Sequence, residues 1–251
     1  MPDRTSLTIG GQTAMVTGGG NGIGRAICFT LAENGATVYV CDLDGAAAES
    51  TAAEIAQSGH RAKPLYCDVS DPASVEAAVE TASADGGIEI LVHCAAIFAR
   101  HKILDMPLED WHRVLNVNLT GTFLVGKAAG AHMQARGSGT ILMMASDRGL
   151  YGGVGNSNYA ASKGGMIAFM KSLALELAPS GVTVNAVNPG TTMTPRLEAE
   201  ASEEFIRRRR EADPQGKLST PENVAGLVLY LVSPAARFIT GQLVTTRIRQ
   251  A

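Results

Sequence analysis

The chain lacks the features that would place a protein in a membrane, in a secretory pathway or on a nucleic acid. No apolar run reaches the roughly 18–20 residues needed to span a bilayer. The first residues, Met1–Arg4, show no basic region followed by an apolar stretch, so no signal peptide is predicted. The formal net charge of −3 argues against non-specific binding to nucleic acid or to an anionic membrane. We therefore expect a cytoplasmic protein that acts on a small molecule.

Cysteine is also scarce, and its spacing excludes two kinds of site. The four cysteines are Cys28, Cys41, Cys67 and Cys94, and none forms a C-x-x-C pair. A metal knuckle or a dithiol redox site is therefore not expected, and we predict no metal site. We interpret the cysteines as small buried hydrophobic residues in a reducing compartment.

The chain is rich in apolar residues, at 45%, and in glycine, with 28 residues spread along its 251 positions. Short apolar segments typical of strands alternate with segments of helical pattern. Strands are expected at 14–17, 37–41, 63–67, 90–93, 140–145, 182–187 and 243–246, and helices at 22–34, 46–58, 72–84, 108–133, 159–177 and 222–232. This alternation predicts a single α/β domain over 1–251, with a Rossmann-type doubly wound parallel sheet of about seven strands and helices on both faces.

One irregular stretch, from Gly190 to Thr220, is too long for a plain connection, and we predict a substrate lid at about 191–217. It contains four consecutive arginines, 207–210. Helical spacing predicts that Glu203 pairs with Arg207 and that Glu204 pairs with Arg208 on a solvent-exposed helix. In the alternative interpretation, one of these arginines faces the cleft and binds a carboxylate or phosphate.

A glycine-rich segment, Thr17-Gly18-Gly19-Gly20-Asn21-Gly22-Ile23-Gly24, connects the first strand to the first helix. Glycines here allow a sharp turn and close approach to a pyrophosphate, and the helix N-terminus offers free N–H groups. The segment therefore predicts a dinucleotide site formed by Gly18, Asn21, Gly22, Ile23 and Gly24. The alternative is a merely tight turn between strand and helix.

Asp42 lies at the end of the second strand, where a carboxylate can accept hydrogen bonds from an adenosine ribose. It would repel the 2′-phosphate of NADP by about 4 kcal/mol at a separation of about 4 Å and an effective dielectric of about 20. Neighbouring Leu43 carries no compensating charge, and neither does Asn21. Arg25, just inside the first helix, is the nearby cation that could offset the repulsion. We predict that the cofactor is NAD rather than NADP, with Leu43 beside it.

Asp68 and Val69 follow the third strand and are placed to meet the adenine. In the alternative interpretation, this segment is the N-cap region of the helix that begins near Pro72.

Tyr159 and Lys163 lie one turn apart on one face of a predicted helix. A phenol titrates near pH 10, and lowering its pKa to about 7 requires roughly 4 kcal/mol. One ammonium at about 5 Å supplies roughly 3 kcal/mol of this at an effective dielectric of 20. The positive charge of oxidised nicotinamide can supply the remainder. The pair can therefore perform general acid/base chemistry, although such pairs are also common on helix surfaces.

Several motifs in order make the chain resemble the short-chain dehydrogenase/reductase family over about residues 8–243. The glycine segment and the Tyr159–Lys163 pair belong to this pattern, and Ser146 stands 13 residues before the tyrosine. The pattern also includes Asn116-Val117-Asn118-Leu119 and Asn188-Pro189-Gly190.

The resemblance implies roles for the matching residues. Tyr159 would exchange a proton with the substrate oxygen, and Ser146 would hold that oxygen. Lys163 would lower the pKa of the tyrosine and bind the nicotinamide ribose, while Asn118 would keep a water in a proton relay. The nicotinamide end of the cofactor would be wrapped by Pro189, Gly190, Thr192 and Thr194, and the adenosine ribose would pass beside Cys94, Ala95 and Ala96. Arg148 could meet an anionic group of the substrate, or it could pair with Asp147 or solvent.

The resemblance implies an NAD(H)-dependent oxidoreductase that interconverts a secondary alcohol and a ketone by hydride transfer. Two alternatives are a 3-oxoacyl-type ketone reductase of the same fold and a non-catalytic NAD-binding regulator. The family also implies a homo-oligomer, a dimer or a homotetramer.

The chain departs from the family pattern in two places. His93-Cys94-Ala95-Ala96 stands where the family usually has Asn-Asn-Ala-Gly. We expect His93 to be a core histidine with satisfied hydrogen bonds; the alternative is a new polar contact. The chain ends at 245–251 without the usual Asp-Gly-Gly segment, which leaves the oligomer contacts open.

Overall fold

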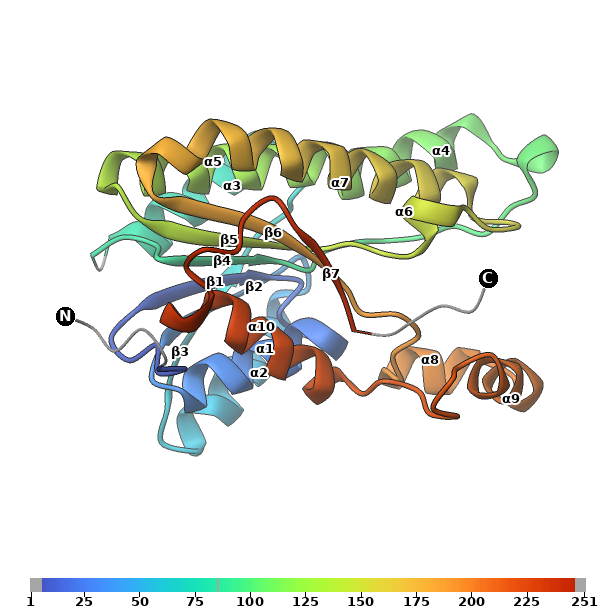
Figure 1. Ribbon diagram of the computed structural model, residues 1–251, viewed down its shortest axis with the longest axis horizontal. Coiled ribbons are helices and arrows are strands. Elements are labelled where there is room, and N and C mark those ends of the chain that lie inside the picture. The colour runs from blue at the N-terminus through green and yellow to red at the C-terminus, as the bar shows by residue number, and fades with distance from the viewer. Residues whose placement is uncertain (1–5, 85, 247–251) are drawn as a thin grey trace.

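A seven-stranded parallel sheet runs through the middle of the molecule (Figure 1). The computed structural model describes residues 6–84 and 86–246. The strand order is β3-β2-β1-β4-β5-β6-β7, and every neighbouring pair is parallel. The strands are β1 (Thr13–Thr17), β2 (Thr37–Asp42), β3 (Arg61–Tyr66), β4 (Ile90–His93), β5 (Gly139–Met144), β6 (Val182–Asn188) and β7 (Leu243–Thr245). This order confirms the predicted doubly wound sheet.

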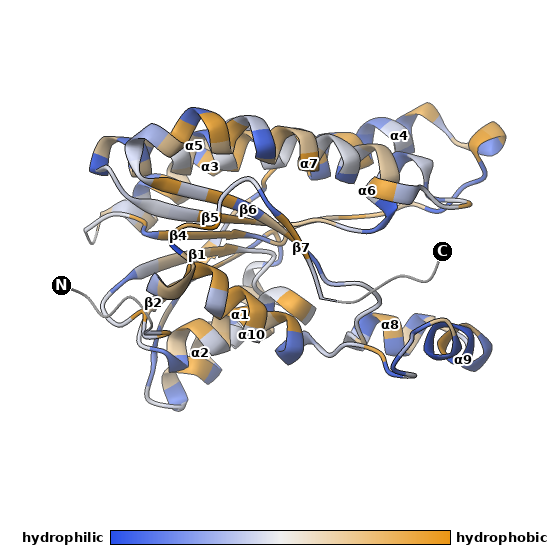
Figure 2. Cartoon of the chain, viewed as in Figure 1, coloured by the Kyte–Doolittle hydropathy of each residue, from blue (hydrophilic) through white to orange (hydrophobic). Residues whose placement is uncertain are grey.

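Helices cover both faces of the sheet because its central strands are apolar on both sides (Figure 2). One face carries α1 (Gly22–Glu33), α2 (Gly45–Gln57) and α10 (Pro221–Val232), and the other carries α3 (Pro72–Ser83), α5 (Gly121–Arg136) and α7 (Ser157–Leu177) (Figure 1). Successive side chains of β1 and β4 alternate between the two cores. Met15 and Leu91 join one core cluster, while Val16 and Val92 join the other. The edge strand β3 is largely exposed and tolerates Pro64, which cannot donate a backbone hydrogen bond.

The long helix expected at 108–133 is interrupted. It consists of α4 (Leu108–Leu115), a π-helical turn η2 (Asn116–Thr120) and α5. Single π-helical turns of this kind are frequent at functional sites. The turn contains Asn118, which is completely buried, whereas Asn116 at its start is exposed.

The segment expected to form a lid contains two helices, α8 (Pro195–Glu200) and α9 (Glu203–Glu211), which project beyond the carboxyl edge of the sheet (Figure 1). Its two ends are joined by a parallel bridge between Thr192 and Ser219 and by a 2.8 Å hydrogen bond from the Met193 N–H to the Ser219 carbonyl. The Thr194 side chain caps α8 by accepting from the Leu197 N–H at 3.2 Å. The two ends of the segment are thus held together by backbone hydrogen bonds, and the chain between them is largely helical.

One of the two ion pairs predicted on α9 is observed, and the other is not. Glu204 pairs with Arg208 as expected. Arg207 pairs with Glu204 and Glu211 rather than with Glu203, because i,i+3 and i,i+4 partners are both within reach on a helix.

Four short elements complete the described chain. They are η1 (Ile103–Asp105), α6 (Arg148–Tyr151), η3 (Ala178–Ser180) and η4 (Pro234–Ala236). None of the described helices is long and apolar enough to cross a membrane. Within the described ranges, no cluster of His, Cys, Asp and Glu is arranged to hold a metal ion. Cys28, Cys41 and Cys67 are buried and Cys94 is partly buried, all as free thiols.

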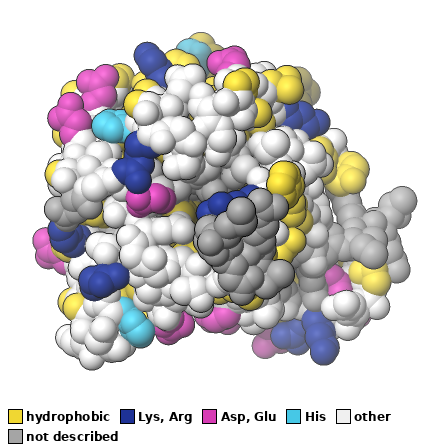
Figure 3. Space-filling model, turned by 60° about the vertical axis from the view of Figure 1, so that its left-hand side comes forward, with side chains coloured by type: hydrophobic (Ala, Val, Ile, Leu, Met, Phe, Trp, Pro, Cys, Tyr) yellow, Lys and Arg dark blue, Asp and Glu magenta, His cyan; other side chains and the backbone are white. Residues whose placement is uncertain are grey.

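Charged side chains of both signs are interspersed on the face that Figure 3 shows. The predictions about Met1–Arg4, and about the chain end beyond Thr246, fall on residues outside those described.

Candidate active site

The residues predicted to bind a cofactor lie together at the carboxyl edge of the sheet, where open α/β sheets bind their ligands. They follow or end five different strands: Gly18, Asn21, Gly22, Ile23 and Gly24 after β1, Asp42 and Leu43 at the end of β2, Asp68 and Val69 after β3, Cys94, Ala95 and Ala96 after β4, and Pro189, Gly190, Thr192 and Thr194 after β6.

The glycine loop is packed so closely that it has no room for larger residues. Gly18 has a φ of +67°, and a Cβ there would lie 2.8 Å from the backbone nitrogen of Ala95. A Cβ on Gly24 would overlap the Gly18 carbonyl oxygen. The side chain of Asn21, at the N-cap of α1, makes no capping hydrogen bond to the helix. The bare turn and the uncapped helix start therefore fit the pyrophosphate of a dinucleotide.

The loop after β6 forms the opposite wall of this cradle. A Cβ on Gly22 would lie 3.5 Å from the methyl group of Thr194. Thr192 is buried, and its hydroxyl donates to the Pro189 carbonyl at 3.1 Å. The two loops thus face each other across the place where the dinucleotide fits.

The Asp42 carboxylate is held in place by backbone donors. Its Oδ2 accepts from the Gly20 N–H at 2.9 Å and its Oδ1 accepts from the Asp44 N–H at 3.1 Å. Arg25, the cation that could have offset its charge, instead pairs with Glu54 and stacks over the Phe29 ring at 4.7 Å. The carboxylate therefore keeps its repulsion toward a 2′-phosphate.

Asp68 does not cap the following helix. Its Oδ1 accepts from the N–H and the hydroxyl of Ser70, at 2.8 and 2.6 Å. The N-cap of α3 is Asp71, which accepts from the Ala73 N–H at 3.1 Å. The segment thus includes the N-cap of α3, as in the alternative interpretation, but the capping residue is Asp71, and Asp68 shapes the turn before it.

The structure brings Ser146, Tyr159 and Lys163 together, with Ser146 just past β5 and the other two on α7. Burial is the largest influence on Tyr159 and raises the pKa of its phenol above the usual value. A hydrogen bond from Ser146 and the charge of Arg148 lower that pKa, while the charge of Asp147 raises it. The protein alone therefore does not lower the pKa of the phenol as the resemblance implies.

Lys163 is buried, and its Nζ donates to the Met144 carbonyl at 2.6 Å. Burial lowers the pKa of the ammonium to about 8, so most molecules remain charged at neutral pH. The Nζ lies 5.7 Å from the centre of the Tyr159 ring, so its positive charge favours the phenolate form. Further positive charge beside the phenol is needed to offset the effect of burial on the pKa of Tyr159.

The side chain of Asn118 holds the loop that follows β4. Its Oδ1 accepts from the Ile97 N–H at 2.8 Å, and its Nδ2 donates to the Ile97 carbonyl at 2.8 Å. The Nδ2 also lies 3.2 Å from the Ser162 hydroxyl on α7. Its side chain thus joins the π-helical turn, the loop after β4 and α7.

His93 satisfies only half of its hydrogen-bonding capacity, contrary to the expectation of a satisfied core histidine. Its Nδ1 lies 2.8 Å from the Thr17 hydroxyl, but its buried Nε2 has no partner. Burial, followed by the nearby charge of Lys163, lowers the pKa of the ring to about 3. His93 is therefore neutral at physiological pH.

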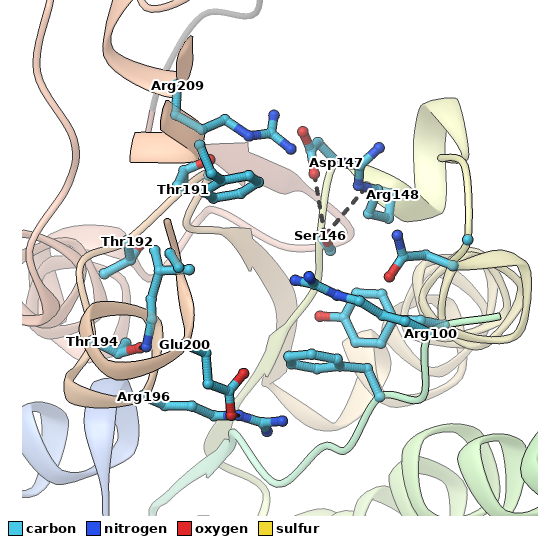
Figure 4. Close-up of a pocket in the computed structure, with 18 of the residues that line it drawn as sticks. Arg100, Ser146, Asp147, Arg148, Thr191, Thr192, Thr194, Arg196, Glu200 and Arg209 are labelled. Atoms are coloured by element: carbon cyan, nitrogen blue, oxygen red, sulfur yellow. Dashed lines mark hydrogen bonds and ion pairs between the residues drawn. The ribbon is translucent and has the colours of Figure 1, made fainter. Parts of the chain in front are cut away.

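A cavity of about 640 Å³ opens beside Ser146 and Tyr159 (Figure 4). Its wall includes Phe98, Arg100 and Arg196, which sequence reasoning did not single out. Phe98 stands edge-on to Tyr159 with 6.0 Å between ring centres. The cavity also contains Arg209, one of the four consecutive arginines, which agrees with the alternative that one of them faces the cleft.

Comparisons with known proteins identify the family of the chain. Residues 18–246 match the family model described as enoyl-(acyl carrier protein) reductase. The chain is 41% identical over 240 residues to the 3-oxoacyl-acyl-carrier-protein reductase of Aquifex aeolicus, covering 95% of this chain and 96% of that one. A solved short-chain type dehydrogenase/reductase from Mycobacterium marinum superposes with a TM-score of 0.90 at 35% identity, covering 95% of both chains. The chain belongs to the short-chain dehydrogenase/reductase family.

Another solved member of the short-chain dehydrogenase/reductase family has a TM-score of 0.91 and is 35% identical, covering 95% of this chain and 96% of that one. It is described as a candidate NAD(P)-dependent gluconate 5-dehydrogenase from Beutenbergia cavernae, with NADP bound at low occupancy. As a member of this family, the chain is an oxidoreductase that uses an NAD(P) cofactor.

Proposed function

We propose that this protein is an NAD(H)-dependent oxidoreductase that interconverts a secondary alcohol and a ketone, with Tyr159 as the general acid/base. The arrangement of Ser146, Tyr159 and Lys163 beside the cavity carries this proposal. A non-catalytic regulator would have no need to keep these three groups together. Their joint placement therefore favours an enzyme.

The chemistry follows from the placement of these groups. A bound nicotinamide would supply the hydride acceptor or donor and, when oxidised, a positive charge. Ser146 donates a hydrogen bond to the substrate oxygen and orients the reacting carbon. Tyr159 takes the hydroxyl proton in oxidation and returns it in reduction. Lys163 provides a positive charge behind the phenol and would bind the ribose hydroxyls of the nicotinamide nucleotide.

The preference for NAD over NADP rests on Asp42. Its carboxylate is held by two backbone N–H groups, and the nearest candidate to neutralise it, Arg25, is paired with Glu54. A fixed negative charge stabilises the ribose hydroxyls of NAD and repels a 2′-phosphate. The solved relative from Beutenbergia cavernae contains NADP at low occupancy, and this observation favours the opposite cofactor preference.

A second candidate is a 3-oxoacyl thioester reductase. The name and 41% identity of the Aquifex aeolicus relative favour it. It would use the same residues in the reductive direction, so the two candidates differ in substrate and not in site.

We propose that α8 and α9 act as a lid over the cavity. Both helices contribute residues to its wall, among them Leu197 and Phe205. Assembly into a dimer or tetramer and a cytoplasmic location stay predictions, made from the sequence and the family.

Two measurements test the proposal. Fluorescence titrations should show that NADH binds at least ten times more tightly than NADPH, and equal affinities would contradict the role of Asp42. A panel of alcohols and 3-oxoacyl thioesters, followed at the absorbance of NADH, should identify turnover that Tyr159→Phe reduces at least about 100-fold. If the Phe variant turned over its best substrate as fast as wild type, Tyr159 would not be the acid/base.

A further inference from the structure

The cavity beside Tyr159 carries more positive than negative charge, although the whole chain has a net charge of −3. Four arginines line it, Arg100, Arg148, Arg196 and Arg209, against two carboxylates, Asp147 and Glu200. A wall with this excess of guanidinium groups favours an anion inside.

Two of these arginines interact with neighbouring residues of the cavity wall. Arg148 donates through Nη1 to the Gly152 carbonyl at 3.1 Å and lies against Gly153. Arg209 stacks over the Phe205 ring of its own helix at 5.1 Å. Both guanidinium groups therefore contribute to the structure of the walls.

Arg100 and Arg196 lie over the same ring, that of Phe98. Their guanidinium carbons lie 5.6 and 4.2 Å from the centre of the Phe98 ring. Within the described part of the chain, no ion pair involves Arg100, and the partner of Arg196 is Glu200, an exposed pair of the kind that contributes little. Figure 4 shows the two arginines extending toward one another from opposite walls.

Arg196 is also close to the reacting centre. The Phe98 ring centre lies 6.0 Å from that of Tyr159 and 4.2 Å from the Arg196 guanidinium carbon, so this cation is at most about 10 Å from the Tyr159 ring. A molecule of a few carbon atoms can span such a distance.

The backbone beside Arg100 is fixed before any substrate binds. The neighbouring His101 N–H donates to the Gly155 carbonyl at 3.2 Å, and the His101 ring lies 2.8 Å from Asp110. Arg196 is fixed by its place in the first turn of α8, which Thr194 caps. An anion between the two cations would connect the β4 loop to the lid helix.

We propose that Arg100 and Arg196, both beside Phe98 in the cavity wall, form a subsite for a carboxylate or phosphate group of the substrate. The substrate is then a small ketone or alcohol with an anionic group a few carbon atoms from its reacting carbon. Guanidinium groups suit either anion because their N–H groups match paired oxygens. This inference rests on the proposed function, because it names the substrate class of the same cavity.

The test measures binding of two pairs of ketones to the complex with NAD⁺, in which no ketone can be reduced. Isothermal titration calorimetry compares 4-oxopentanoate with its methyl ester, and dihydroxyacetone phosphate with dihydroxyacetone. At least one anionic ketone should bind ten or more times more tightly than its neutral partner, and the pair with the larger ratio identifies the anionic group. Its affinity should fall as salt is raised.

The variants assign the effect to the two arginines. Arg100→Gln and Arg196→Gln should each weaken the anionic ketone about five- to tenfold and leave the neutral ketone unchanged. Arg210→Gln, an exposed arginine of α9 outside this cavity wall, is the matched control and should change neither. Equal affinities within both pairs, no binding of any of the four, or the same loss in Arg210→Gln would overturn the inference.

Turnover with NADH separates this inference from the proposed function. Reduction of neutral ketones without any preference for anionic ones would leave the function standing and overturn the subsite. Arginine-dependent binding without hydride transfer to any ketone would support the subsite and contradict the function.

Discussion

The buried ammonium of Lys163 donates a 2.6 Å hydrogen bond to the carbonyl oxygen of Met144. This bond connects α7 to the end of β5. Because Met144 stands two residues before Ser146, the bond also fixes the separation between Ser146 and Tyr159. One side chain therefore supplies charge to the phenol and sets the geometry of the pair that holds the substrate oxygen.

Replacing Lys163 by methionine separates activity from stability. Lys163→Met should lower kcat at least about 100-fold, since it removes the charge behind Tyr159. The free energy of unfolding should change by no more than about 1 kcal/mol, because the lost hydrogen bond is offset by removal of a buried charge. Steady-state kinetics and urea unfolding measure the two effects. Lys171→Met, at an exposed position of the same helix, is the control and should leave kcat unchanged.

Removing the charge of Asp42 should change the choice of cofactor. In Asp42→Asn the size of the side chain is kept and the repulsion of the 2′-phosphate is lost. The ratio of the NADPH and NADH dissociation constants should fall at least about tenfold, well within the repulsion of about 4 kcal/mol that a fixed carboxylate can exert. Fluorescence titration measures both constants. Asp105→Asn, an equal charge change in η1, should not alter the ratio.

Truncating Asn118 should loosen the loop after β4. Asn118→Ala removes the paired hydrogen bonds to Ile97 and leaves the Ile97 N–H and carbonyl without their partner. We expect a loss of about 2–4 kcal/mol in the free energy of unfolding, from two lost bonds at the typical cost of buried unsatisfied groups. Urea unfolding measures it. Asn116→Ala, at the exposed start of the same turn, should cost less than about 1 kcal/mol.

His93 makes the stability depend on pH. Its pKa falls to about 3 in the folded protein, whereas an unfolded histidine titrates near pH 6.5. Below pH 6.5, His93 therefore binds a proton in the unfolded chain but not in the folded protein. The contribution of His93 is constant above about pH 6.5, and stability is lost progressively as the pH falls toward 3. Linkage gives a loss of about 2 kcal/mol between pH 7 and pH 5.

Unfolding of His93→Asn at these two pH values tests this account. The variant should lose about 2 kcal/mol less than wild type over the interval, since asparagine does not titrate. His112→Asn, at an exposed position of α4, should follow wild type. An unchanged pH dependence in His93→Asn would mean that the folded ring takes up its proton over the same pH range as the unfolded one.

The sheet could be predicted from the sequence because each strand and helix has its own local pattern. The glycine loop was also predictable, since its sharp turn needs glycine at fixed positions. The pairing of Arg25 with Glu54 was not, because it joins residues 29 positions apart on two helices whose packing is a tertiary result. The contact of Arg196 with Phe98 joins α8 to the loop after β4, almost a hundred residues away, and it could not be predicted for the same reason.

The remaining differences have physical causes of the same kind. Periodicity did not reveal the π-helical turn at Asn118, because one extra residue barely disturbs an apolar pattern. The Nε2 of His93 could not be judged from sequence, because its lack of a partner depends on every neighbour in the core.

The bridge between Thr192 and Ser219 gives the lid segment two ends that stand next to each other. A segment with adjacent ends can be lengthened, shortened or replaced at little cost in chain closure, since that cost grows slowly with length. Such an exchange would leave the structure of the strands and of the glycine loop unchanged. In this fold, the residues proposed for the chemistry belong to the constant part of the structure. Substrate selectivity depends partly on a segment that can be replaced independently of it.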